Sequence, residues 1–122
     1  MPFKFEKLIV WQKSVDLSEY IHQMVKKFPK DEMYILTSQI KRAADSVSLN
    51  IAEGSTGQSG AQFSRYLGIA VGSTIEVVGC MHLARRRRYV EDNEFYTICA
   101  MCEEILVMIN ALRNSVKNRK IE

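Results

Sequence analysis

The feature that most constrains the fold of this chain is the spacing of its apolar residues. Between positions 95 and 116 the spacing is three or four throughout, on a line made of Phe95, Ile98, Cys102, Ile105, Ile109, Leu112 and Val116. Such spacing places side chains on one face of an α-helix, whereas a half-buried strand would need a period of two. The segment therefore predicts a long helix with one buried face.

Three earlier segments repeat this pattern. Their apolar lines are Val10, Ser14, Leu17, Ile21, Met24 and Phe28; Leu36, Ile40, Ala43 and Val47; and Phe63, Leu67, Ala70, Thr74, Val77, Met81 and Ala84. Breaks fall at Pro29 and at positions 54–60 and 89–94. We predict helices over about 7–28, 32–53, 60–87 and 92–118. Joined by short links, they form an all-α fold, an antiparallel up-down-up-down four-helix bundle with one domain over 1–122.

The glycine-rich link at 54–60 is interpreted as a plain connection. A phosphate-binding P-loop needs a lysine followed by Ser or Thr where the next helix opens, but here Ala61 and Gln62 follow the last glycine. Gly54 suits the left-handed position that ends a helix, while Ser59 with Gln62 fits a capping box that opens the next one. Asp92 is expected to cap the fourth helix.

Charge and composition favour a soluble chain. The opening "MPFKFEKLIVWQKS" carries charges every few residues, so it lacks the apolar core of a secretory signal. We find no run of eighteen apolar residues, and we expect a cytoplasmic protein without membrane contact. In that compartment the three cysteines are expected to be thiols. The net charge of +3 permits contact with nucleic acid but does not require it.

Asn50 raises a specific question, because it occupies the next place on the second apolar line after Val47. Burying an amide without a partner costs about 1 to 3 kcal/mol, so Asn50 should have hydrogen-bonding partners. In an antiparallel bundle the second and third helices meet near their shared link, which brings polar residues of both together. We predict a structural polar network of Arg42, Asn50, Glu53, Ser73 and Glu76 that fixes helix register or a subunit contact.

Catalytic and metal-binding interpretations of these residues are weaker. Glu53 and Glu76 could act as acid and base in a hydrolase. Di-metal bundles need paired Glu-x-x-His motifs, but neither His22 nor His82 follows a glutamate by three residues. We therefore predict no catalytic residue, no metal and no cofactor.

A zinc site is a further alternative. Cys99 and Cys102 form a CxxC, and folding the chain back near position 90 brings Cys80 and His82 towards it. Cys80 and Cys102 both fall on apolar faces, where cysteine behaves as a small hydrophobic residue. We expect these cysteines to belong to the core.

Three stretches carry a resemblance to a known family: "VWQKSVDL", "FPKDEMYILTSQIKRAADSVSLNIAEGS" and "FSRYLGIAVGSTIEV". They resemble the four-helix-bundle proteins called 23S ribosomal RNA intervening-sequence proteins, whose reading frames lie in insertions of bacterial ribosomal RNA genes. The resemblance covers nearly the whole chain and implies a ring-shaped homopentamer with no established catalytic activity. Related bundles are accessory proteins of diversity-generating retroelements, where a basic pentamer works with nucleic acid. The "RRRR" at 85–88 replaces a less basic stretch of the family pattern.

That arginine run is the best candidate for function. Four consecutive helical residues sweep about 300 degrees, so they cannot share one face. The predicted topology gathers seven cations at one pole, namely Arg85, Arg86, Arg87, Arg88, Lys26, Lys27 and Lys30. Five acidic residues share this pole: Asp31, Glu32, Glu91, Asp92 and Glu94. The cluster is either a solvated cap that interacts with helix dipoles or a surface for RNA or DNA backbone. Only Tyr89 adjoins it in sequence, so selectivity for bases is not expected.

Apolar residues left over after the bundle closes predict self-association. The first helix has a second apolar line with Leu8, Trp11 and Val15, and the third is widened by Tyr66, Ile69 and Val71. We predict a non-enzymatic homo-oligomer, a pentamer by resemblance, that binds RNA or DNA backbone through its basic pole. The alternative is a protein-binding scaffold or accessory subunit with no nucleic-acid contact.

Overall fold

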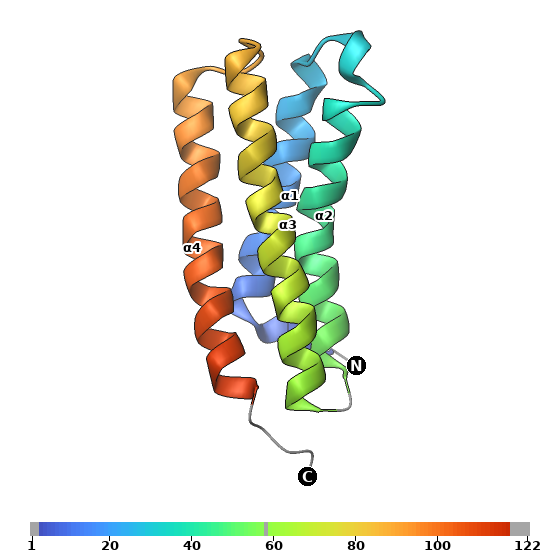
Figure 1. Ribbon diagram of the computed structural model, residues 1–122, viewed down its shortest axis with the longest axis vertical. Coiled ribbons are helices and arrows are strands. Elements are labelled where there is room, and N and C mark those ends of the chain that lie inside the picture. Colours follow the sequence, from blue (N-terminus) through green and yellow to red (C-terminus); the bar gives the residue numbers. More distant parts are fainter. Residues whose placement is uncertain (1–2, 58, 118–122) are drawn as a thin grey trace.

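A computed structural model describes residues 3–57 and 59–117, and these residues form four long helices packed side by side (Figure 1). The helices are α1 (Ile9–Met24), α2 (Leu36–Ser55), α3 (Gly60–Arg86) and α4 (Asp92–Val116). Short 3-10 turns precede α1 (η1, Lys4–Lys7) and lie between α1 and α2 (η2, Val25–Lys27, and η3, Lys30–Glu32). Figure 1 shows the chain running up, down, up and down. The prediction of an all-α bundle is confirmed, and no strand occurs in the described part.

The link between α1 and α2 is longer than the sequence predicts. The first helix was expected to reach position 28, but α1 ends at Met24 and the backbone tightens into η2. Pro29 explains this end, because proline excludes the helical conformation from the residue before it, and Phe28 is extended with φ −66° and ψ 149°. Residues 30–32 form a separate turn, so α2 begins at Leu36 and not at 32. The predicted end of the fourth helix, position 118, lies outside the described residues.

The core is a continuous column of aliphatic side chains contributed by all four helices. The largest fully buried side chains are Leu17, Ile21, Leu36, Ile40, Ile51, Leu67, Met81, Ile98, Ile105, Ile109, Val47 and Val77. Each contributes about 1.5 to 3 kcal/mol by leaving water. On α2 the residue that continues the core line is Ile51, with no exposure, whereas Asn50 is half-buried. A step of four residues from Val47 advances 40 degrees past a full turn, which keeps Ile51 on the inner face.

Gly54 marks the closest approach of α2 to α3. The expected left-handed end is wrong, because Gly54 is buried inside α2 and none of the described glycines has a positive φ. A Cβ atom at Gly54 would lie 2.6 Å from the Cβ of Tyr66 and 3.0 Å from Cδ1 of Phe63. The small residue thus serves packing and not chain reversal. Ser59 caps α3 as predicted, and it forms the serine half of the expected capping box, since its side chain accepts a hydrogen bond from the backbone amide of Gln62 at 3.1 Å.

The C-terminus of α3 ends in a Schellman motif with an unusual residue. The amide of Tyr89 donates to the carbonyl of Ala84 at 2.9 Å, and that of Arg88 donates to Arg85 at 3.0 Å. Arg88 occupies the left-handed position with φ 64°, where glycine is the usual residue. The chain therefore turns back towards α4 at the end of the basic run.

The second apolar line on α1 packs against other parts of the same subunit. Leu8 and Trp11 are half-buried and pack against the core, as does Val71 of α3. The ring of Phe5 meets that of Trp11 edge-on at 4.9 Å. Much of the surface that we expected to mark a subunit contact is thus covered by η1 and the bundle itself.

By length and composition alone, α3 and α4 could each cross a membrane. This is weak evidence, because core helices of soluble bundles pass the same test, and both helices contribute side chains to the core here. The absence of membrane contact stays a prediction.

Candidate nucleic-acid interface

The basic pole is the end of the bundle where α1 and α3 finish and α2 and α4 begin, at the top of Figure 1. It carries the seven predicted cations, on η2, on η3 and on the end of α3 with its link to α4. The fold thus places together residues that are up to 62 positions apart in the chain, from Lys26 to Arg88.

Two of these cations are paired with acidic residues of α4. Lys27 forms an ion pair with Glu94, and Nε of Arg85 lies 3.1 Å from Oδ1 of Asp92. The predicted cap at Asp92 is therefore wrong, since Glu91 takes the capping position and its amide donates to Glu94 at 2.8 Å. Asp92 instead neutralises Arg85, so neither Lys27 nor Arg85 offers an uncompensated charge.

A third cation, Arg87, belongs to a cluster around the buried carboxylate of Glu32. Oε2 of Glu32 accepts from the hydroxyl of Tyr89 at 2.7 Å and from Nη1 of Arg87 at 3.0 Å, while Oε1 accepts from the amide of Leu36 at 3.4 Å. The hydrogen bond from Tyr89 is the main reason that the pKa of Glu32 lies below its usual value. The cluster ties the α1–α2 link to the α3–α4 link.

The lowered pKa makes bundle stability depend on pH. Glu32 contributes stability above its unfolded pKa of about 4.3, and this contribution is lost as the pH falls through its lower folded pKa. We expect Glu32→Gln to destabilise the protein at neutral pH, and the difference from wild type to shrink on acidification below about pH 4. Urea denaturation at several pH values measures this. The exposed neighbour Asp31, changed to Asn, is the matched control and should show neither effect; a difference for Glu32→Gln that did not change with pH would contradict the assignment.

The other four cations are open to solvent. Lys26, Lys30, Arg86 and Arg88 are exposed, and within the described part of the chain they form no ion pair. Arg86 and Arg88 line one surface hollow, together with His82, Leu83 and Arg85. Because no carboxylate lines this hollow, it is suited to an anion.

An aromatic cluster that sequence reasoning missed adjoins the hollow. The guanidinium carbon of Arg85 lies 4.5 Å from the ring centroid of Phe95 and 5.1 Å from that of Tyr96, and Nη2 is 3.3 Å from the Tyr96 hydroxyl. The ring of His82 meets Phe95 edge-on at 4.9 Å. Sequence reasoning considered only Tyr89, the residue adjacent to the run. The useful signal was the aromatic pair in the first turns of α4, which faces the end of α3.

The predicted polar network between α2 and α3 forms only in part. Nδ2 of Asn50 donates to the carbonyl of Ser46 at 2.8 Å and to its Oγ at 2.9 Å, and Oγ of Ser46 lies 2.8 Å from Oγ of Ser73. Asn50 and Ser73 are thus joined through Ser46, which was not predicted. This chain of polar groups bridges α2 and α3.

The remaining predicted members lie outside that chain. Glu76 is exposed and accepts a hydrogen bond from Gln39 at 3.3 Å. Arg42 and Glu53 are exposed, and none of the described polar contacts involves their side chains. The buried face of α2, on which we expected polar side chains, carries Ile51 and Gly54 instead. None of the described contacts joins Glu53 to Glu76, the two carboxylates of the hydrolase alternative.

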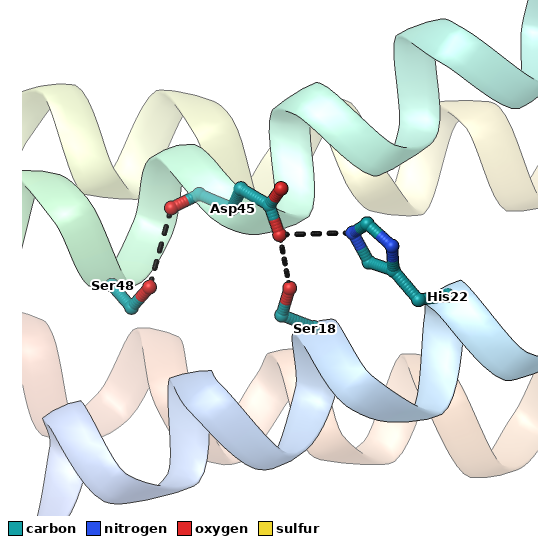
Figure 2. A network of polar contacts seen from close by, with 4 residues as sticks. All are labelled: Ser18, His22, Asp45 and Ser48. Carbon is teal, nitrogen blue, oxygen red and sulfur yellow. Dashed lines mark hydrogen bonds and ion pairs between the residues drawn. The ribbon is translucent and has the colours of Figure 1, made fainter.

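A second polar cluster, between α1 and α2, was also missed (Figure 2). Oδ1 of Asp45 accepts a hydrogen bond from Ser18 and lies 3.0 Å from Nε2 of His22, while Ser48 donates to the Asp45 carbonyl at 3.2 Å. A catalytic triad needs serine bonded to histidine. Here both point to the same carboxylate oxygen (Figure 2), so the arrangement links two helices and does not activate a nucleophile. Its sequence signal is the four-residue step from Ser18 to His22.

The cysteines do not have the properties of a zinc site. Cys80 and Cys102 are buried, and burial raises the pKa of these thiols to about 11 and about 12. Zinc binding requires thiolates, which such surroundings disfavour. Among the described residues no group of three or more His, Cys, Asp or Glu side chains is placed to hold a metal ion.

A second hollow lies between α1 and α4. Its lining includes three acidic residues, Asp16, Glu19 and Glu94, and two lysines, Lys26 and Lys27, beside Tyr20. The three carboxylates outnumber the two lysines and repel phosphate, so this hollow is a poorer anion site than the one lined by Arg86 and Arg88.

The fold and the charge distribution define a helical-bundle protein with a basic pole on which four of the seven cations have no ion-pair partner among the described residues. The chain belongs to the 23S rRNA-intervening sequence protein family, whose model matches residues 6–111, and the resemblance inferred from the sequence is confirmed.

The fold is shared with a solved structure from Bacteroides thetaiotaomicron, a protein of unknown function from the S23 ribosomal protein family. The two chains are 23% identical, with a TM-score of 0.78, over 86% of this chain and 98% of the other. At this identity the likeness establishes the fold alone. No curated protein matches this chain.

Proposed function

We propose that this chain is a non-enzymatic, homo-oligomeric cytoplasmic protein that binds the phosphate backbone of RNA or DNA through its basic pole. The observation that carries this proposal is the set of four exposed cations, Lys26, Lys30, Arg86 and Arg88, which have no acidic partner among the described residues. Backbone binding needs such free charges, because each phosphate that is neutralised releases counterions.

Self-association supports this function. Exposed Asp31 and Glu91 lie at the same pole and weaken its field, so a single subunit should bind modestly. Several copies of the patch in one ring would bind together and multiply the affinity. Two apolar side chains left on the outer face of α3, Ile69 and Ile75, with exposures of 41% and 56%, are available for subunit contacts. Native mass spectrometry gives the subunit number.

Removing two of the free cations should weaken binding and its salt dependence. In the double variant Arg86→Ala/Arg88→Gly, glycine suits the left-handed position of Arg88, so the fold should survive. We expect the slope of log affinity against log salt to fall by roughly one for each cation lost. Fluorescence anisotropy of labelled RNA and DNA at several salt concentrations measures the slope.

The matched control is Lys4→Ala/Lys7→Ala, which removes the same charge from exposed residues of η1 at the opposite pole. It should leave the slope nearly unchanged. Equal effects of both double variants would show that net charge, and not the basic pole, drives binding. If wild type does not bind even at low salt, nucleic-acid binding is wrong.

A protein-binding role is the second candidate, and one observation favours it. Met33, Tyr34 and Ile35 form a continuous apolar run before α2, with exposures of 47%, 88% and 62%. Such a run is typical of a contact with another protein. This candidate gains if wild type fails the nucleic-acid titration while native mass spectrometry still shows assembly.

A further inference from the structure

We propose that the nucleic acid recognised at the basic pole is single-stranded, with a base stacked on Tyr96 and phosphates held by Arg86 and Arg88. This inference rests on the function proposed above and specifies its ligand. Every base presents a flat face, so stacking combines with backbone contacts without requiring a particular sequence.

Tyr96 is exposed and held in place. Its side chain is 59% exposed, while its neighbour Phe95 is only 5% exposed and is packed in the bundle. The two rings meet at 82° with centroids 5.3 Å apart, so Tyr96 packs against the buried ring of Phe95. An exposed ring that is already ordered loses little conformational entropy when a base stacks on it.

Arg85 connects this ring to the free cations. Its guanidinium lies over the Tyr96 ring and is fixed by the ion pair with Asp92. The same arginine lines the hollow that Arg86 and Arg88 share with His82. A stacking surface and two uncompensated charges therefore adjoin one another, which is the combination that proteins use to hold single strands.

Three other tyrosines near this pole are less suitable. Tyr20 is 37% exposed and lines the hollow that contains three acidic residues. Tyr89 is half-buried, and its hydroxyl is bonded to Glu32. Tyr34 is more exposed than Tyr96, but none of the described cations lies over its ring. A regular duplex keeps its base faces stacked inside, so it could use the cations but not Tyr96.

Replacing Tyr96 tests the inference directly. We expect Tyr96→Ala to weaken binding of labelled oligo-uridine by roughly 5- to 150-fold, the measured range for one stacked base. Affinity for an RNA duplex of equal length should change less than about twofold, because its bases cannot reach the ring. Tyr96→Phe, which retains the ring, should bind the single strand as wild type does. Tyr34→Ala removes an exposed ring elsewhere and should change neither affinity, and circular dichroism verifies the helix content of each variant.

The outcomes separate this inference from the proposed function. If wild type binds both ligands, and Tyr96→Ala weakens neither or weakens both equally, single-strand recognition is wrong while backbone binding stands. If Tyr96→Phe fails like Tyr96→Ala, the hydroxyl acts by orienting Arg85, and base stacking is wrong. If wild type binds neither ligand at low salt, both proposals fall.

Discussion

Replacing Ile51 by alanine is expected to lower the free energy of unfolding by about 2 to 5 kcal/mol. Ile51 has no exposed surface and lies in the column of aliphatic side chains between α2 and its neighbours. Truncation removes three carbon atoms from that column and leaves a cavity that rigid helices fill only partly. Urea denaturation followed by circular dichroism measures the change.

The control lies two residues away on the same helix. Leu49 is 65% exposed, so Leu49→Ala should change the free energy of unfolding by no more than about 0.5 kcal/mol. If Leu49→Ala proved as costly as Ile51→Ala, the helix phase described for α2 would be wrong, or Leu49 would be buried in an assembly. Repeating the measurement at several protein concentrations separates these two explanations.

A single methyl group at Gly54 should destabilise the bundle by about 1 to 3 kcal/mol. The added Cβ would lie 2.6 Å from Cβ of Tyr66, an atom fixed to the backbone of α3. Rotation of a side chain cannot relieve that contact, so α2 and α3 must separate. Thermal unfolding of Gly54→Ala should therefore begin at a lower temperature than that of wild type.

The same substitution at Gly79 should have the opposite sign. Gly79 is exposed on α3, and nothing lies within 4 Å of a Cβ built there. Alanine in a helix interior is more favourable than glycine by about 0.5 to 1 kcal/mol, so Gly79→Ala should stabilise an isolated subunit. Loss of stability at both positions would contradict the close approach assigned to Gly54, unless native mass spectrometry shows that Gly79→Ala disrupts assembly.

The sequence predicts the helices well because their apolar periodicity is long and regular. A stripe of seven apolar residues on α4 leaves no alternative to a helix. The phase of α2 near its end was harder to predict, because Asn50 and Ile51 are adjacent and steps of three and four residues both keep to one face. The link around Pro29 was misjudged because local backbone sterics, and not periodicity, end α1 there.

The candidate site was predicted in composition but not in charge balance. Topology alone brings the seven cations to one pole, and the sequence supplies that topology. Which cations remain free depends on contacts between distant elements, such as Arg87 with Glu32, 55 residues apart. Tyr96 was missed for the same reason, since its place beside Arg85 depends on how α4 packs against α3.

The Glu32 cluster has a mechanical consequence for the molecule. One carboxylate fastens the two links at this end, so the pair α1 and α2 is clamped to the pair α3 and α4 there. Breathing motions should start at the far end of the bundle, and amide hydrogens near the clamp should exchange slowly. The bundle is then most rigid at the basic pole. A ligand bound there would contact the end of the molecule that moves least.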